Sequence, residues 1–158
     1  MPVIALRPLV DTDADALFRM MQDPESVRMA AFTPEDPTDR ARFDTYLTRI
    51  RTDPTITSRA ITYDGAVAGN IGAFRMEGDL DVAYWIDRPL WGRGIASQAL
   101  ELFLRIVTER PLHARAASDN LGSLRVLRKA GFQPQATEIS YASARGTEIE
   151  ETILRLDA

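Results

Sequence analysis

Hydrophobic and polar residues follow two spacings along this chain, and each spacing predicts a different element. Apolar residues three and four positions apart mark one face of a helix, whereas a short apolar run bounded by turn residues predicts a strand. Helical stripes cover residues 17–21, 43–50, 100–107 and 121–130. Expected strands cover residues 3–6, 59–63, 67–74, 81–86, 112–117 and 148–156.

The order of these elements predicts a mixed α/β fold. Asp64-Gly65 is a strong two-residue hairpin turn, so the strands around it are expected to pair antiparallel. The Val-Ala-Tyr-Trp-Ile run at 82–86 is continuously apolar, which predicts a strand in the middle of the sheet. Strand and helix then alternate from residue 81 to residue 130. No repeat or linker interrupts the chain, so we expect one domain over residues 1–158.

Composition narrows the class of protein without selecting a function. Apolar residues make up 45% and charged residues 27% of the chain, which is ordinary for a folded domain. A net charge of −4 with no basic segment disfavours nucleic acid as a partner. No signal segment and no apolar run of membrane-spanning length is present, so we expect no membrane partner and a cytoplasmic location.

Cysteine is absent, and His113 is the one histidine. This composition removes disulfides, thiolate nucleophiles, Cys-based zinc sites and His-rich metal sites. We therefore expect no metal, and we interpret His113, which lies in a short apolar strand, as structural.

Two glycines, Gly92 and Gly94, stand between the strand at 81–86 and the next helix. The first N–H groups of a helix have no acceptor within it, and the helix dipole adds about half a positive charge there. Without Cβ atoms a phosphate can approach this backbone closely. The stretch therefore predicts an anion site, to which Arg93 and the Ser97 hydroxyl add donors. The alternative is a tight connection with no ligand.

The same glycines leave a choice of phosphate ligand. A P-loop is disfavoured because the lysine and its spacing are missing. A dinucleotide site stays open, because the residues from Gly92 to Ser97 nearly satisfy Gly-x-Gly-x-x-Gly/Ala and Asp119 lies near the end of the next strand. Only about 40 residues follow that point, however, which is too few for a doubly wound sheet.

Residues Trp91 to Ala96 resemble the pyrophosphate loop, Gln/Arg-x-x-Gly-x-Gly/Ala, of the GNAT superfamily of acyl-coenzyme A-dependent N-acyltransferases. Gly94 and Ala96 match, and Trp91 takes the first position, as in the branch that resembles ribosomal-protein N-terminal acetyltransferases. The stretches 6–25, 81–86 and 120–132 are similar to that branch in order and spacing. The resemblance implies a mostly antiparallel sheet of six to seven strands, splayed between the fourth and fifth strands and flanked by about four helices.

The resemblance also implies how acetyl-CoA, as co-substrate, is held. Backbone N–H groups of the loop would bind its pyrophosphate, the strand end would pair with its pantetheine arm, and the next helix start would bond the same arm. The implied cofactor-binding residues are Trp85, Ile86, Gly92, Arg93, Gly94, Ile95, Ala96, Ser97 and Asn120.

Two residues carry the chemistry that the resemblance implies. Asp81 stands where the branch has an acidic residue and would act as the general base; alternatively it is a strand-end carboxylate that holds a turn or the substrate amine. Ser123 would protonate the leaving thiolate, or is simply a first-turn helix serine. Leu127 occupies the position of the tyrosine that many members use as acid, and a thiolate with pKa of about 8.5 also leaves unassisted. Glu150 is a weaker second candidate for the base.

The acceptor is expected to be a primary amine, either a protein N-terminus or a small molecule, attacked directly in a ternary complex. Tyr84 and Trp85 are expected to line the core or the slot, and the segment from Phe32 to Pro37 to border the acceptor site. The resemblance makes a homodimer one of the expected assemblies. A non-catalytic acyl-CoA-binding module is the alternative to an enzyme.

Overall fold

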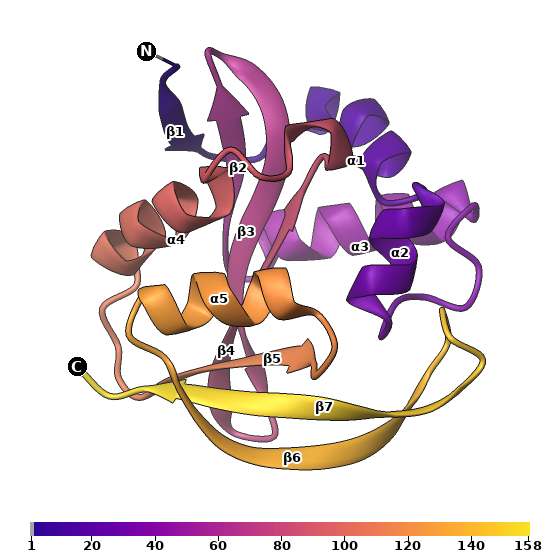
Figure 1. Cartoon of the computed structure of the whole chain (residues 1–158). Coiled ribbons are helices and arrows are strands. Elements are labelled where there is room, and N and C mark those ends of the chain that lie inside the picture. The colour runs from indigo at the N-terminus through magenta and orange to yellow at the C-terminus, as the bar shows by residue number, and fades with distance from the viewer. Residues whose placement is uncertain (1) are drawn as a thin grey trace.

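The computed structural model describes residues 2–158 and contains a single seven-stranded sheet with five α-helices (Figure 1). The strands are β1 (Ile4–Arg7), β2 (Thr57–Tyr63), β3 (Ala66–Met76), β4 (Asp79–Ile86), β5 (Leu112–Ala117), β6 (Gln133–Ala142) and β7 (Thr147–Leu156). The helices are α1 (Ala14–Met20), α2 (Pro24–Ala30), α3 (Arg40–Thr52), α4 (Ile95–Ile106) and α5 (Leu121–Lys129), with 3-10 turns η1 (Asp11–Asp13) and η2 (Arg88–Leu90). Within residues 2–158, no helix is both long and apolar enough to cross a membrane.

The sheet has the strand order β1-β2-β3-β4-β5-β7-β6, and neighbouring strands are antiparallel except β4 and β5. These two parallel strands share only two residue pairs, Asp81 with His113 and Val82 with Ala114. Beyond those pairs they diverge, with β5 turning across the molecule in Figure 1. We call this divergence the fork. The expected splay between the fourth and fifth strands is confirmed.

Helices cover both sides of the sheet. Leu80, Val82 and Ile86 of β4 pack into a core shared with α4 and α5, which we call the α4 face. Trp85 packs with residues of α1 and α3 on the opposite side, the α3 face. Because successive strand residues point to opposite faces, Asp81 also lies on the α3 face. The two sides of β4 therefore present different chemistry at the fork.

The structure contains two elements that the sequence analysis did not predict, helix α2 and strand β6. Helix α2 begins at Pro24 and is capped by Asp23, whose carboxylate accepts a hydrogen bond from the Ser26 N–H at 3.0 Å. Capping and proline chemistry, rather than a long apolar stripe, define this helix. Strand β6 is exposed over almost its whole length, so it carries no hydrophobic alternation to predict it. It forms by pairing with β7.

Gly69 of β3 fixes how closely β3 approaches β4 next to the fork. A Cβ atom at this position would lie 1.8 Å from the Trp85 carbonyl oxygen and 2.9 Å from its carbon. Both are backbone atoms and have no rotamer to change. The Trp85 carbonyl therefore faces β3, which is the side of β4 away from the fork.

We expect Gly69→Ala to lower the free energy of unfolding by about 3 kcal/mol, since the strand backbones must move apart. Gly122→Ala is the matched control, because its Cβ would meet nothing nearer than Asn120 Oδ1 at 3.9 Å in helix α5. That change should preserve stability or raise it by about 0.5–1 kcal/mol. Urea unfolding measures both; equal midpoints would contradict the close approach.

Candidate active site

The turn that leads into α4 is shaped by glycines in the left-handed region. Gly92 has φ +79° and Gly94, the residue preceding the helix, has φ +75°. Nothing in the described chain lies within 4 Å of a Cβ built on either residue. The first helical bond runs from the Gln98 N–H to the Gly94 carbonyl at 3.1 Å. We call residues 91–94 the glycine turn.

The N–H groups that open α4 are therefore available to a ligand. Those of Ile95, Ala96 and Ser97 precede the first helical bond and have no acceptor within the helix. The helix is held against the sheet by its buried residues Ile95, Ala99 and Phe103. A rigid helix start with open space above two glycines suits an anion.

Trp91 ties the glycine turn to the end of β4. Its indole Nε1–H donates to the Ile86 carbonyl oxygen at 2.9 Å, while 43% of the residue remains exposed. The Asp87 N–H donates to the Ala68 carbonyl on β3 at 2.8 Å. Since backbone groups alternate sides along a strand, Tyr84 and Ile86 direct theirs toward the fork. Trp91 thus occupies one of the acceptors on this open edge.

Tyr84 and Ser123 meet across the fork on the α4 face. Their hydroxyl oxygens are 2.9 Å apart, and Ser123 lies in the first turn of α5. Burial raises the pKa of Tyr84, and the hydrogen bond with Ser123 lowers it in part. The sequence singles out both residues without indicating that they touch, because Tyr84 and Ser123 are 39 positions apart.

Asn120 has two contacts in the structure. Its Oδ1 accepts from the Ser123 N–H at 3.2 Å and caps α5, and its Nδ2–H donates to the Met29 carbonyl of α2 at 3.4 Å. The fold therefore brings Asn120 next to Ser123, and Asn120 also ties the start of α5 to α2.

Asp81 lies at the closed end of the fork and is only 4% exposed. Its carboxylate Oδ2 is 3.8 Å from the Arg115 Nε of β5. Burial raises the pKa of Asp81, and the positive charge of Arg115 offsets this in part. A carboxyl group with a raised pKa holds a proton more tightly than an exposed one, which suits a proton acceptor.

Glu151 is a site residue that the sequence analysis missed. It is 9% exposed and its Oε1 accepts from Arg115 Nη1 at 3.3 Å, whereas Glu150 is exposed. Burial also raises the pKa of Glu151. Strand alternation places adjacent glutamates on opposite faces, but the sequence does not tell which of the two faces inward.

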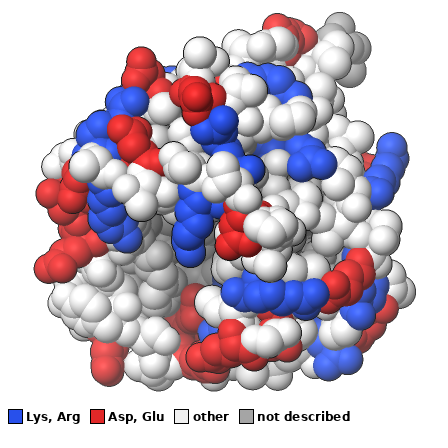
Figure 2. Space-filling view, turned by 180° about the vertical axis from the view of Figure 1, so that it is seen from behind, with Lys and Arg blue, Asp and Glu red and all other residues white. Residues whose placement is uncertain are grey.

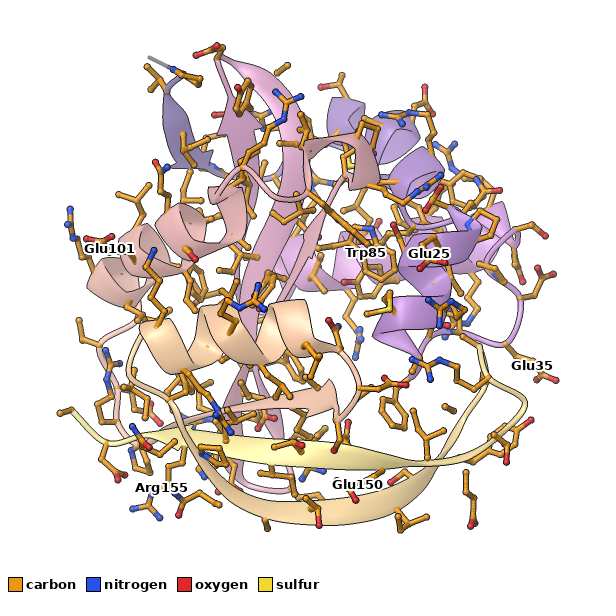
Figure 3. All side chains as sticks on the ribbon, in the orientation of Figure 1. Glu25, Glu35, Trp85, Glu101, Glu150 and Arg155 are labelled. Atoms are coloured by element: carbon orange, nitrogen blue, oxygen red, sulfur yellow. The ribbon has the colours of Figure 1, made fainter. Side chains whose placement is uncertain are left out.

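The α3 face beside the fork carries mixed charge and a hollow, seen toward the lower left of Figure 2. Figure 3 shows Trp85 on the side of α2 and α3, and Glu150 on β7. A cavity of about 370 Å³ at the end of β5 is lined by Ser118, Asp119, Ile149 and Glu150. Phe32 packs beside it, in a cluster with Ala117 and Ile149. The segment after α2 therefore lies next to the mouth of the fork.

Comparison with known proteins identifies the family. Residues 4–133 match the family model described as an acetyltransferase (GNAT) domain, which covers most of the chain. The chain belongs to the GNAT acetyltransferase family. This is a family of acetyl-CoA-dependent N-acetyltransferases, and the predicted class of enzyme is confirmed.

Individual relatives of this GNAT domain are distant. It is 24% identical to an uncharacterized N-acetyltransferase p20 from Bacillus licheniformis over 161 residues, which cover 93% of this chain and 88% of the relative. A ribosomal L7/L12 alpha-N-protein acetyltransferase, RimL, in complex with coenzyme A has 18% identity, a TM-score of 0.83 and coverage of 98% and 93%. Mycobacterium smegmatis RimJ in complex with a CoA-disulfide has 20% identity, a TM-score of 0.83 and coverage of 99% and 82%.

We expect Asp81→Asn to raise the thermal unfolding midpoint at pH 8. Burial raises the pKa of this carboxyl, so the folded protein favours the protonated form over the charged one. For a raised pKa, the associated stability is complete below the unfolded value of about 3.9 and is lost as pH rises through the folded value. The gain of the variant over wild type should therefore shrink between pH 8 and pH 4.

Thermal unfolding at pH 4, 6 and 8 measures this dependence, with Glu150→Gln as the exposed-carboxylate control. The control should show no gain that depends on pH. An Asp81→Asn midpoint below wild type at pH 8 would mean that the Arg115 contact outweighs the burial of the charge.

Proposed function

We propose that this GNAT domain transfers the acetyl group of acetyl-CoA to a primary amine, either a small molecule or a protein N-terminus, by direct attack in a ternary complex. One observation carries the proposal. The open edge of β4 has a glycine turn with unpaired helix N–H groups at one end and a buried carboxylate at the other. The fork thus joins an anion site to a proton acceptor.

The open space above Gly92 and Gly94 and the N–H groups that precede the first bond of α4 support coenzyme A as the ligand. The N–H groups from Gly92 to Ser97 would hold the pyrophosphate, assisted by the Arg93 side chain and the Ser97 hydroxyl. The backbone groups of Tyr84 and the Ile86 N–H, which face the fork, would pair with the pantetheine arm in the manner of an added strand, while the Ile86 carbonyl accepts from the Trp91 indole. Trp85, which was expected to pair with the arm at the strand end, has its carbonyl against β3 instead, so that part of the expectation is corrected. Its side chain packs on the α3 face and would contribute to the wall there. Asn120 would bond the arm from the start of α5.

Acetyl-CoA supplies an activated acetyl group and a thiolate leaving group, and the protein must manage two protons. Asp81 would accept the proton that the amine loses, directly or through a water molecule. Its raised pKa brings its basicity closer to that of the amine. A peptide α-amine, with a pKa of about 8, is already partly neutral at pH 7. It therefore depends less on a base for its deprotonation than a lysine side chain does.

Ser123 would donate its hydroxyl proton to the thiolate from the opposite face and regain a proton from solvent once the products leave. Its hydroxyl is paired with that of Tyr84, so the two groups form one short donor chain beside the fork. Leu127, at the position of the usual tyrosine acid, is fully buried in the core and has no proton to give. A thiolate with a pKa of about 8.5 is a good leaving group. We therefore expect its protonation by Ser123 to contribute less to the rate than the base does.

We expect acetyl-CoA at a hundred times its Kd to stabilise the protein by about 2.7 kcal/mol in thermal unfolding. NAD should give no shift. Gly94→Ala should abolish most of the acetyl-CoA shift, because a Cβ fills the space above the helix start and strains the left-handed turn.

Gly78→Ala is the matched control for this experiment. Gly78 also has a positive φ, +89°, and open space around it, but it lies in the β3–β4 turn. The Gly78→Ala variant should lose about as much stability without ligand as Gly94→Ala does. It should keep the full stabilisation by acetyl-CoA. Stabilisation by NAD alone would instead favour a dinucleotide site.

We expect Asp81→Asn to lower kcat/KM for an amine that the wild-type protein acetylates by about 10²-fold or more at pH 7, with the stabilisation by acetyl-CoA preserved. Ser123→Ala should lower it by about tenfold or less, since the thiolate can leave unassisted. Glu148→Gln, on the same strand as the second candidate Glu150 but exposed and outside the cavity lining, is the exposed-carboxylate control and should retain turnover. Full activity of Asp81→Asn would show that another group, or the solvent, takes the proton. Absence of turnover by the wild-type protein with every amine, despite tight acetyl-CoA binding, would favour a non-catalytic binding module.

A further inference from the structure

Arg115 of β5 connects three carboxylates across three strands on the α3 face. Its Nε is 3.8 Å from Asp81 Oδ2 on β4, and its Nη1 donates to Glu151 Oε1 on β7 at 3.3 Å. The same Nη1 donates to Glu138 Oε2 on β6 at 3.0 Å. One guanidinium thus bridges from the closed end of the fork to the far edge of the sheet.

The three carboxylates differ sharply in exposure. The side chains of Asp81 and Glu151 are 6% and 11% exposed, whereas that of Glu138 is 52% exposed. Two buried carboxylates therefore share one cation of fixed charge. An arginine guanidinium cannot release its proton in a protein, so any change of charge in this cluster occurs on the carboxylates.

We propose that Arg115 and Glu151 are positioning residues that act through Asp81: Arg115 holds the Asp81 carboxylate at the closed end of the fork, and Glu151 competes with Asp81 for the same guanidinium. This inference rests on the proposed function, in which Asp81 is the base. It adds that the base is tuned from β5 and β7, which lie on the other side of the fork from β4.

The remaining charges around Asp81 come from its own hairpin and from β5. His113 faces it from β5, and the Asp79 and Glu77 carboxylates face it from β4 and the preceding turn. Arg75 of β3, next to the residue paired with Asp81, is engaged by Glu109 at 2.7 Å. Among residues 2–158, Arg115 is therefore the only arginine that brings a side-chain nitrogen within 4 Å of the Asp81 carboxylate.

Removal of each partner should move the proton affinity of Asp81 in opposite directions. Without the Arg115 charge, the carboxylate keeps its burial and loses its cation, so its pKa rises. Without the Glu151 charge, Arg115 interacts with one buried carboxylate fewer, so the pKa of Asp81 falls. If Arg115 and Glu151 had only a packing role, both variants would be less stable, but the pKa of Asp81 would not rise in one and fall in the other.

The test combines two measurements on the whole chain: the pH dependence of kcat/KM, and the titration of the Asp81 carboxyl carbon by ¹³C NMR. The Asp81 signal is assigned by its loss in Asp81→Asn. We expect Arg115→Gln to move the acid limb and the NMR midpoint upward by about one pH unit. Glu151→Gln should move both downward. Arg115→Lys, which keeps the charge, should stay nearer to wild type than Arg115→Gln.

Glu138→Gln is the matched control, because its carboxylate contacts the same Nη1 but is half exposed. It should move the midpoint less than Glu151→Gln, since solvent screens its charge. If Arg115→Gln does not fold, Glu151→Gln alone decides: a downward shift supports the proposal, and no shift or an upward shift overturns it.

The failure of this inference can be told apart from that of the proposed function. Full turnover by Asp81→Asn overturns the assignment of the base, whatever the titrations show. Low turnover by Asp81→Asn, together with an NMR midpoint that neither Arg115→Gln nor Glu151→Gln moves, leaves the base in place and overturns the coupling.

Discussion

The limited pairing between β4 and β5 is the constraint on which the whole site depends. Two parallel neighbours that share only the pairs at Asp81 and Val82 must leave backbone groups of β4 unpaired beyond them. Unpaired strand edges inside a protein need partners from somewhere. The end of β4 obtains one from the Trp91 indole, and the remaining edge is left for an extended ligand. The proposed binding of acetyl-CoA would thus depend on an incomplete sheet.

The fork also separates two kinds of chemistry by strand alternation. Even-numbered residues of β4 face α4 and α5, where Tyr84 meets Ser123, and odd-numbered residues face α1 and α3, where Asp81 lies. A ligand in the fork would therefore have hydroxyl groups on one side and a carboxylate on the other. The period of two in a strand sets the opposite faces of Tyr84 and Asp81, whereas Ser123 is placed by the capped start of α5.

Burial decides the character of the charged groups near the fork. Asp81 and Glu151 are both held out of water, and for both the cost of burial exceeds the help from Arg115, so the pKa of each is raised. Asp13 shows the opposite balance in the same protein. Two hydrogen bonds from Arg7, at 2.8 and 2.9 Å, and one from the Val10 N–H lower its pKa despite burial. Three short hydrogen bonds stabilise the charged form of Asp13, whereas Glu151 accepts only one at 3.3 Å and Asp81 has its cation 3.8 Å away, so burial prevails at both.

The sequence by itself determined the elements with a strong local signal and the fold class. The apolar run at 82–86, the glycines before α4 and the asparagine before α5 each act within a few residues, so the strand, the turn and the helix start that they form follow from local chemistry. Helix α2 and strand β6 lacked an apolar period and were missed. The contacts of Arg115 with Asp81 and Glu151 join strands 34 to 36 positions apart, and only sheet order and register bring these residues together. The pairing of Tyr84 with Ser123 and the inward turn of Glu151 rather than Glu150 were likewise decided by tertiary structure, because burial depends on which face of a strand is covered.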